Sequence, residues 1–161
     1  MKKKIKKIAA ALLAFTIGCV SLTGCSARQD TIRFGAAGVG GGYYAFATAY
    51  TQLANAEDSD MNFEVKSTAG SMANLRLLSE GYVDVAIAQA DLAAAAYYGT
   101  DENGESYQGY RVLAGLYTEA CQIVVRKDSG IKSLDDLQGK TVSVGESESG
   151  TERNALQILQ V

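Results

Sequence analysis

From residue 31 onward, short apolar runs alternate with segments whose apolar side chains recur at helical spacing, and this alternation most constrains the fold. Strands that are joined through helices pair in parallel, because the helical crossover returns the chain to the same end of the sheet. We therefore predict an α/β fold with a mostly parallel sheet. The expected strands are residues 31–36, 62–66, 83–89, 111–117, 122–126 and 141–144.

The segments between these strands carry helix signals. Tyr43, Phe46 and Tyr50 lie at helical spacing, as the core-facing side chains of a helix do. Ser71 and Asp91 are the expected N-caps of two further helices. The expected helices are residues 43–56, residues 72–80, the alanine-rich segment that ends at residue 98, a short helix that starts at residue 133, and residues 151–159.

The N-terminal segment has the parts of a secretory signal. Residues 1–7 carry five lysines, and residues 8–20 form an apolar run shorter than the roughly 20 residues that span a bilayer. Residues 22–25 read Leu-Thr-Gly-Cys, which resembles the lipobox of bacterial lipoproteins. That resemblance implies cleavage before Cys25 and lipidation of its thiol. The alternative is an ordinary signal peptide with a chance cysteine.

Charge and composition argue against several classes of function. The 161 residues include 15 basic and 18 acidic side chains, and five of the basic ones lie in the signal, so the exported part has a net charge of −8. Such an acidic chain argues against a nucleic-acid partner. The sequence has no histidine, which removes Ser-His and Cys-His catalysis and most zinc sites. Cys121 is the one cysteine after Cys25, and we expect it to be buried in a strand rather than reactive.

Four polar segments are expected between the carboxyl end of a strand and the start of a helix: residues 38–43, 67–71, 89–91 and 146–151. Ligands of open α/β sheets bind at such positions, where helix N-termini offer unpaired N–H groups. The glycines, hydroxyls and amide of these segments favour a small polar anion such as a carboxylate. A nucleotide fits less well, because Tyr43 stands where a P-loop or a dinucleotide fingerprint needs lysine or glycine. A glycine-rich loop that only makes a tight turn is the plainer alternative.

A set of short motifs runs in order from Thr31 to the C-terminal end. They read Gly-Gly-Tyr-Tyr at 41–44, Ser-Thr-Ala-Gly-Ser at 67–71, Asn-Leu-Arg-Leu-Leu at 74–78, Gly-Tyr-Val-Asp-Val-Ala at 81–86, Ile-Val-Val-Arg-Lys-Asp-Ser-Gly-Ile at 123–131, Asp-Leu-Gln-Gly-Lys at 136–140 and Ser-Gly-Thr-Glu at 149–152. The set resembles the TAXI family, which comprises the solute-binding subunits of one class of TRAP transporters.

The resemblance implies a two-lobed periplasmic-binding-protein fold of type II that binds rather than catalyses and needs no cofactor or metal. It implies capture of a small carboxylated solute, glutamate-like or a dicarboxylate, for TRAP membrane subunits. The place would be the extracytoplasmic face of the cell membrane or the periplasm. The implied ligand-binding residues are Gly41, Gly42, Tyr43, Thr68, Ser71 and Gln89 in the first lobe, Tyr117 near the crossing between lobes, and Ser149, Gly150 and Thr151 in the second lobe.

The length of the chain bears on its organisation, because a second lobe needs on the order of 100 residues and 44 follow Tyr117. We expect a fragment or a truncated gene product. This chain also departs from the family pattern, because it has Ser147-Glu148 where relatives often have Pro-Gly. Glu148 adds a negative charge beside the expected anion site. The expected domains are a signal peptide at 1–24, lipidated Cys25 with a tether at 25–30, a first lobe at 31–116 and a partial second lobe at 117–161.

Other classes of function stay open beside this reading. An enzyme on the same fold would depend on Ser–Lys or carboxylate chemistry, because histidine is absent. A sensor module would need a transmembrane helix, and no apolar run long enough follows residue 25. A truncated product without function is a further alternative.

Overall fold

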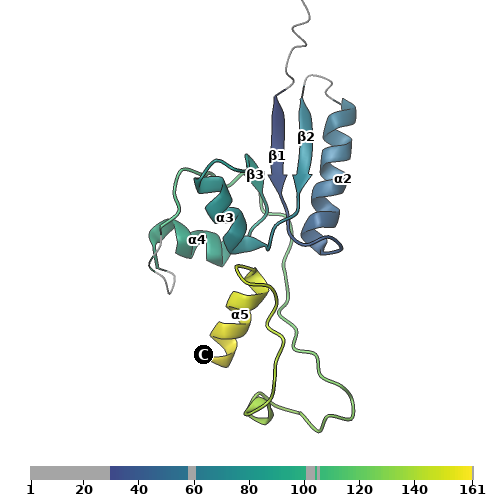
Figure 1. Cartoon of the computed structure of the whole chain (residues 1–161), viewed down its shortest axis with the longest axis vertical. Coiled ribbons are helices and arrows are strands. Elements are labelled where there is room, and N and C mark those ends of the chain that lie inside the picture. The colour runs from purple at the N-terminus through teal and green to yellow at the C-terminus, as the bar shows by residue number, and fades with distance from the viewer. Residues whose placement is uncertain (1–29, 58–60, 101–103, 105, 161) are drawn as a thin grey trace, which may run out of the picture. The chain divides into compact units, whose positions relative to one another are not determined.

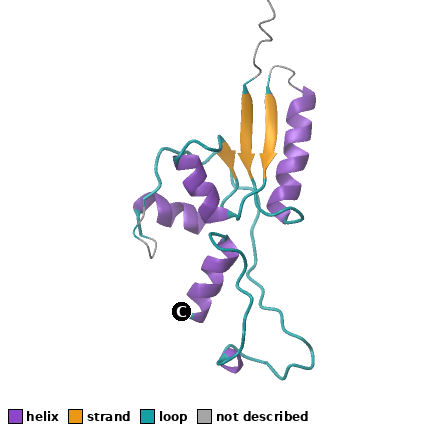
Figure 2. Ribbon diagram, in the orientation of Figure 1, coloured by secondary structure: helices purple, strands orange, loops and turns teal. Residues whose placement is uncertain are grey.

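The computed structural model describes residues 30–57, 61–100, 104 and 106–160, so Cys25 and the signal segment lie outside the described residues. Short strands and helices follow one another in a structural unit that begins at Thr31 (Figure 2). The strands are β1 (Thr31–Gly35), β2 (Asn62–Lys66) and β3 (Val85–Ala86). The helices are α2 (Gly42–Glu57), α3 (Ser71–Ser79), α4 (Ala90–Tyr98), α5 (Gly150–Leu159) and the short 3₁₀ helix η1 (Asp135–Leu137).

The three strands form one sheet in the order β2-β1-β3, and both pairings are parallel. Thr31 lies opposite Asn62, and Phe34 lies opposite both Val65 and Val85. The prediction of an α/β fold with a parallel sheet is therefore confirmed. Because the strands are parallel, their carboxyl ends meet at one edge, from which the chain continues into α2, α3 and α4 (Figure 1).

Two apolar clusters hold the elements together. In the first, Phe34 and Ile87 from the sheet region pack with Ala47 of α2, and Tyr50 meets the rings of Phe34 and Phe63 edge-on. The second joins α3 to α4 through Met72, Leu75 and Ala96. The helical spacing of Tyr43 and Phe46 thus marks a core-facing side of α2, whereas Tyr50 meets two aromatic rings but stays 46% exposed.

Three of the strands that the sequence predicts do not form. Residues 111–117, 122–126 and 141–144 have no regular secondary structure, and Val112, Leu113 and Val124 are at least 80% exposed. The prediction of a buried Cys121 is also wrong, since its side chain is exposed. A strand needs a hydrogen-bonded neighbour, which apolar content alone does not supply. For the same reason, the strand expected at 83–89 shortens to β3, which pairs with the last two residues of β1.

The expected N-caps of α3 and α4 need correction as well. Ser71 is the first helical residue of α3, and Gly70 with φ of 128° precedes it as the N-cap. A positive φ of this size favours glycine, which explains a glycine directly before this helix. Asp91 lies in the first turn of α4 behind the N-cap Gln89. The helix expected at 151–159 is confirmed as α5, and the Ser149 hydroxyl accepts the Glu152 N–H as its cap.

Among the described residues, no helix combines the length and the apolar character that a bilayer crossing requires.

Candidate functional site

Beneath the carboxyl edge of the sheet, the fully buried side chain of Asn74 joins three segments of the chain. Its Nδ2 donates to the carbonyl oxygens of Ala36 at 2.6 Å and of Ile87 at 2.7 Å. Its Oδ1 accepts the Thr68 hydroxyl at 2.7 Å. These acceptors follow β1 and β3, and the Thr68 donor follows β2, so one amide holds all three loops in register at the edge where a ligand is expected.

Ser71 lies at the centre of the polar groups above this edge. Its side chain is 2% exposed, and its Oγ accepts the backbone N–H of Gln89 at 3.1 Å. The backbone of Gly150 lies against the same pair, because a Cβ there would collide with the Gln89 carboxamide and stand 2.9 Å from Ser71 Oγ. Gln89 Oε1 is buried and has no hydrogen-bond partner among the described residues. Three segments distant in sequence therefore converge on Ser71.

Tyr43 extends this group toward residues 117–119. Its hydroxyl donates to Glu119 Oε2 at 2.6 Å, and its ring meets that of Tyr117 edge-on at a centroid distance of 6.5 Å. Burial, followed by the bond to Glu119, raises the pKa of Tyr43, while a hydrogen bond from Ser71 opposes that rise. The phenol therefore stays protonated at neutral pH and acts as a donor.

The first turn of α3 is already partnered within the chain. The carbonyl oxygen of Glu148 accepts the N–H groups of Met72 at 3.1 Å and Ala73 at 3.2 Å. The Glu148 carboxylate pairs with Arg76 at 2.8 Å, and this pairing lowers the pKa of Glu148. The negative charge that the sequence places at Glu148 is thus offset by a cation of α3.

The structure brings half of the ten expected ligand-binding residues together. Tyr43, Ser71, Gln89 and Gly150 are joined by the contacts above, and Tyr117 meets Tyr43. Other residues serve the backbone: the Gly41 carbonyl accepts the Ala45 N–H at the start of α2, whose first residue is Gly42, Thr68 is bonded to Asn74, and Ser149 caps α5. Thr151 is exposed beside Gly145.

Four helices begin around Ser71, and this arrangement sets the electrostatics of the site. Tyr43 is in the first turn of α2, Ser71 opens α3, Gln89 caps α4 and Gly150 opens α5. Each helix N-terminus carries about half a unit of positive charge, so their meeting favours an anion. Within the part of the chain that the structure describes, no three His, Cys, Asp or Glu side chains are placed to hold a metal ion.

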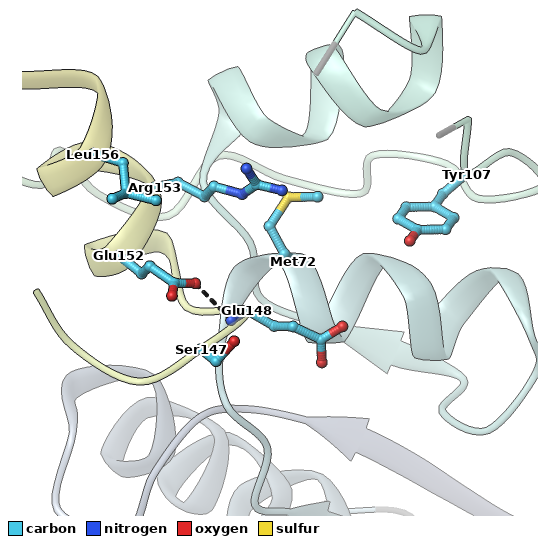
Figure 3. Close-up of a pocket in the computed structure, with 7 residues that line it drawn as sticks. All are labelled: Met72, Tyr107, Ser147, Glu148, Glu152, Arg153 and Leu156. Atoms are coloured by element: carbon cyan, nitrogen blue, oxygen red, sulfur yellow. Dashed lines mark hydrogen bonds between the residues drawn. The ribbon is translucent and has the colours of Figure 1, made fainter. Parts of the chain in front are cut away.

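A separate cavity of about 260 Å³ lies between α3 and α5 (Figure 3). Met72 and Leu156 give it apolar walls, while Glu152 and Arg153 line it with charge. Glu152 Oε2 accepts the Glu148 N–H at 2.8 Å, which fixes the loop before α5. The cavity therefore borders the Glu148 contact with α3.

Four residues of this site were not among the candidates from the sequence. Asn74 had a usable signal, because a carboxamide between Met72 and Leu75 on the buried side of a helix needs partners. Arg76 and Glu148 are 72 residues apart, and their pairing has no local signal. Glu119 lies in a segment without regular structure, so no periodicity marks it.

The profile of the NMT1-like family matches residues 34–161, which is more than half of the chain. The matched range includes every element after β1 and all the residues that meet around Ser71.

Proposed function

Because the chain belongs to the NMT1-like family, whose members are periplasmic-binding-protein-like solute-binding proteins, we propose that it captures a small carboxylated solute for a TRAP-type transport system. The solute is glutamate-like or a dicarboxylate. The convergence of four helix N-termini on Ser71, with the Tyr43 hydroxyl beside it, carries this proposal, since backbone dipoles and hydroxyl donors favour a carboxylate.

The two-lobed architecture of type II belongs to the same proposal. Residues 31–116 would form the first lobe and residues 117–161 part of the second. The contacts of Glu148 and Gly150 with α3 support a site that both parts line. Gly41, Gly42, Thr68, Tyr117, Ser149 and Thr151 would surround the solute or hold the backbone that does.

A thermal-shift panel of matched probes tests the solute class. L-glutamate and succinate are compared with L-glutamine and succinamate, each of which replaces one carboxylate by an uncharged amide. A bound solute raises the melting temperature in proportion to ln(1 + [L]/Kd). The proposal expects larger shifts for each acid than for its amide. Equal shifts within each pair would show that the site does not recognise the negative charge of that carboxylate.

We also propose that the protein is a lipoprotein on the extracytoplasmic face of the cell membrane, based on Leu-Thr-Gly-Cys at 22–25. Acyl chains contribute about 0.8 kcal/mol per buried methylene group, so several chains anchor a protein firmly. The expected mature protein begins at an acylated Cys25 and fractionates with membranes, while Cys25→Ser is released from them. Mass spectrometry that finds an unmodified Cys25 or an intact Met1 would reject the anchor.

A further inference from the structure

A carboxylate of the chain itself already lies at the proposed solute site. The Glu119 side chain accepts the Tyr43 hydroxyl at 2.6 Å, a short distance of the kind found when an O–H group donates to a charged oxygen. Glu119 lies in a segment without helix or strand, and its residue is exposed. Regular secondary structure therefore does not hold this carboxylate in place, although its partner Tyr43 is fixed in the first turn of α2.

Tyr43 is the donor that reaches this carboxylate, because its hydroxyl donates to Glu119 Oε2. The Gln89 N–H donates instead to Ser71 Oγ at 3.1 Å, so that N–H already has a partner within the chain. Tyr43 is therefore the donor of this group whose partner is a carboxylate of the chain.

The α3 N-terminus is filled in a similar way by the Glu148 carbonyl, which accepts the N–H groups of Met72 and Ala73. A carbonyl there satisfies donors but adds no charge. Glu119 is thus the group that brings a carboxylate, and not merely a carbonyl, into contact with a donor of the site, the Tyr43 hydroxyl.

We propose that the position of the Glu119 carboxylate on Tyr43 is the subsite for the carboxylate of the solute, and that Glu119 is an internal occupant that the solute displaces. This inference rests on the proposed function. It assigns the Tyr43 hydroxyl as the donor to the solute carboxylate and Glu119 as a competitor for that donor. An internal contact that is formed in about nine molecules of ten weakens the apparent affinity about tenfold.

The test is calorimetric titration of the exported chain with succinate and with L-glutamate, comparing wild type with Glu119→Ala. Glu57→Ala is the matched control, because it removes one exposed carboxylate from the other end of α2. At 1.5 Å per residue, Glu57 lies about 20 Å along the helix from Tyr43. We expect Glu119→Ala to bind both probes about tenfold more tightly and Glu57→Ala to match wild type. In wild type, hydrogen exchange at residues 117–121 should rise when succinate is added.

The other outcomes are separable. Unchanged affinity in Glu119→Ala with either probe overturns the internal occupant but leaves the proposed function standing. Weaker binding of L-glutamate alone would show that Glu119 contacts the ammonium group, which also overturns it. If neither probe binds any variant, the proposed solute class itself is rejected, and this inference with it.

Discussion

Asn74 Nδ2 donates to the Ala36 carbonyl oxygen at 2.6 Å, which fixes the end of β1 to the middle of α3. The same side chain also donates to Ile87 and accepts from Thr68. A single buried amide therefore sets the relative positions of the loops that follow all three strands. The donors at Tyr43, Ser71 and Gln89 depend on those loops.

Replacing Asn74 by leucine should lower the free energy of unfolding by about 2–4 kcal/mol, because two buried carbonyls and a hydroxyl each lose a hydrogen bond. Thr68→Val loses only the hydroxyl and should cost about 1 kcal/mol. Urea denaturation measures both. Similar small losses in the two variants would mean that Asn74 does not organise this edge.

The ion pair between Arg33 and Asp84 predicts a pH dependence of stability. Hydrogen bonds from the Arg33 side chain and backbone lower the pKa of Asp84 to about 2 from 3.8. The unfolded chain then binds a proton more readily than the folded one. The stabilisation is complete above about pH 4 and disappears as the pH falls through about 2. Solvent screens this exposed pair, so the effect is small.

Thermal melting of wild type and Asp84→Asn from about pH 6 to about pH 2 checks this prediction. The wild type should melt at the higher temperature near pH 6, and the difference should close toward pH 2. A difference that stays constant across this range would contradict the assigned role of the carboxylate.

Gly150→Ala should disturb the contact of α5 with α3, because the added Cβ would collide with the Gln89 carboxamide and stand close to Ser71 Oγ. Overpacking of this kind costs about 1–3 kcal/mol. Gly115→Ala is the control, since nothing lies within 4 Å of its added Cβ. Hydrogen exchange at the Met72 and Ala73 amides should quicken in Gly150→Ala alone. Equal exchange in the two variants would mean that the contact between α5 and α3 does not depend on the glycine at position 150.

The sequence was informative where structure is local. Patterns within single segments predicted β1, β2, α2 and α5 closely, and Ser149 was within the motif that begins α5. The expected strands at 111–117 and 122–126 were wrong because pairing partners, not apolar content, decide whether a strand forms. Ser71 resembled an N-cap, but its hydroxyl bonds to Gln89, which lies 18 residues further along the chain.

The same difference between local patterns and contacts of distant segments applies to the candidate site. Residues 41–43, 67–71 and 89 were predicted from strand ends and helix starts, which parallel pairing brings to one edge. The Glu119 contact with Tyr43 spans 76 residues and the Glu148 contact with Arg76 spans 72. Such pairs depend on tertiary packing of segments that carry no periodic signal, so residue patterns alone do not predict them.

The most direct test of a carboxylate site at Tyr43 is titration of Tyr43→Phe with the carboxylate that wild type binds most tightly, made in a Glu119→Ala parent that lacks the internal occupant, with Tyr44→Phe in the same parent as the control. Tyr44 is the next residue of α2 and packs against the first apolar cluster. Loss of a hydrogen bond to a charged group corresponds to about ten- to a hundredfold in Kd. We predict that loss for Tyr43→Phe relative to the Glu119→Ala parent, and the affinity of that parent for Tyr44→Phe. Equal affinity of Tyr43→Phe and the Glu119→Ala parent would contradict a carboxylate site at Tyr43.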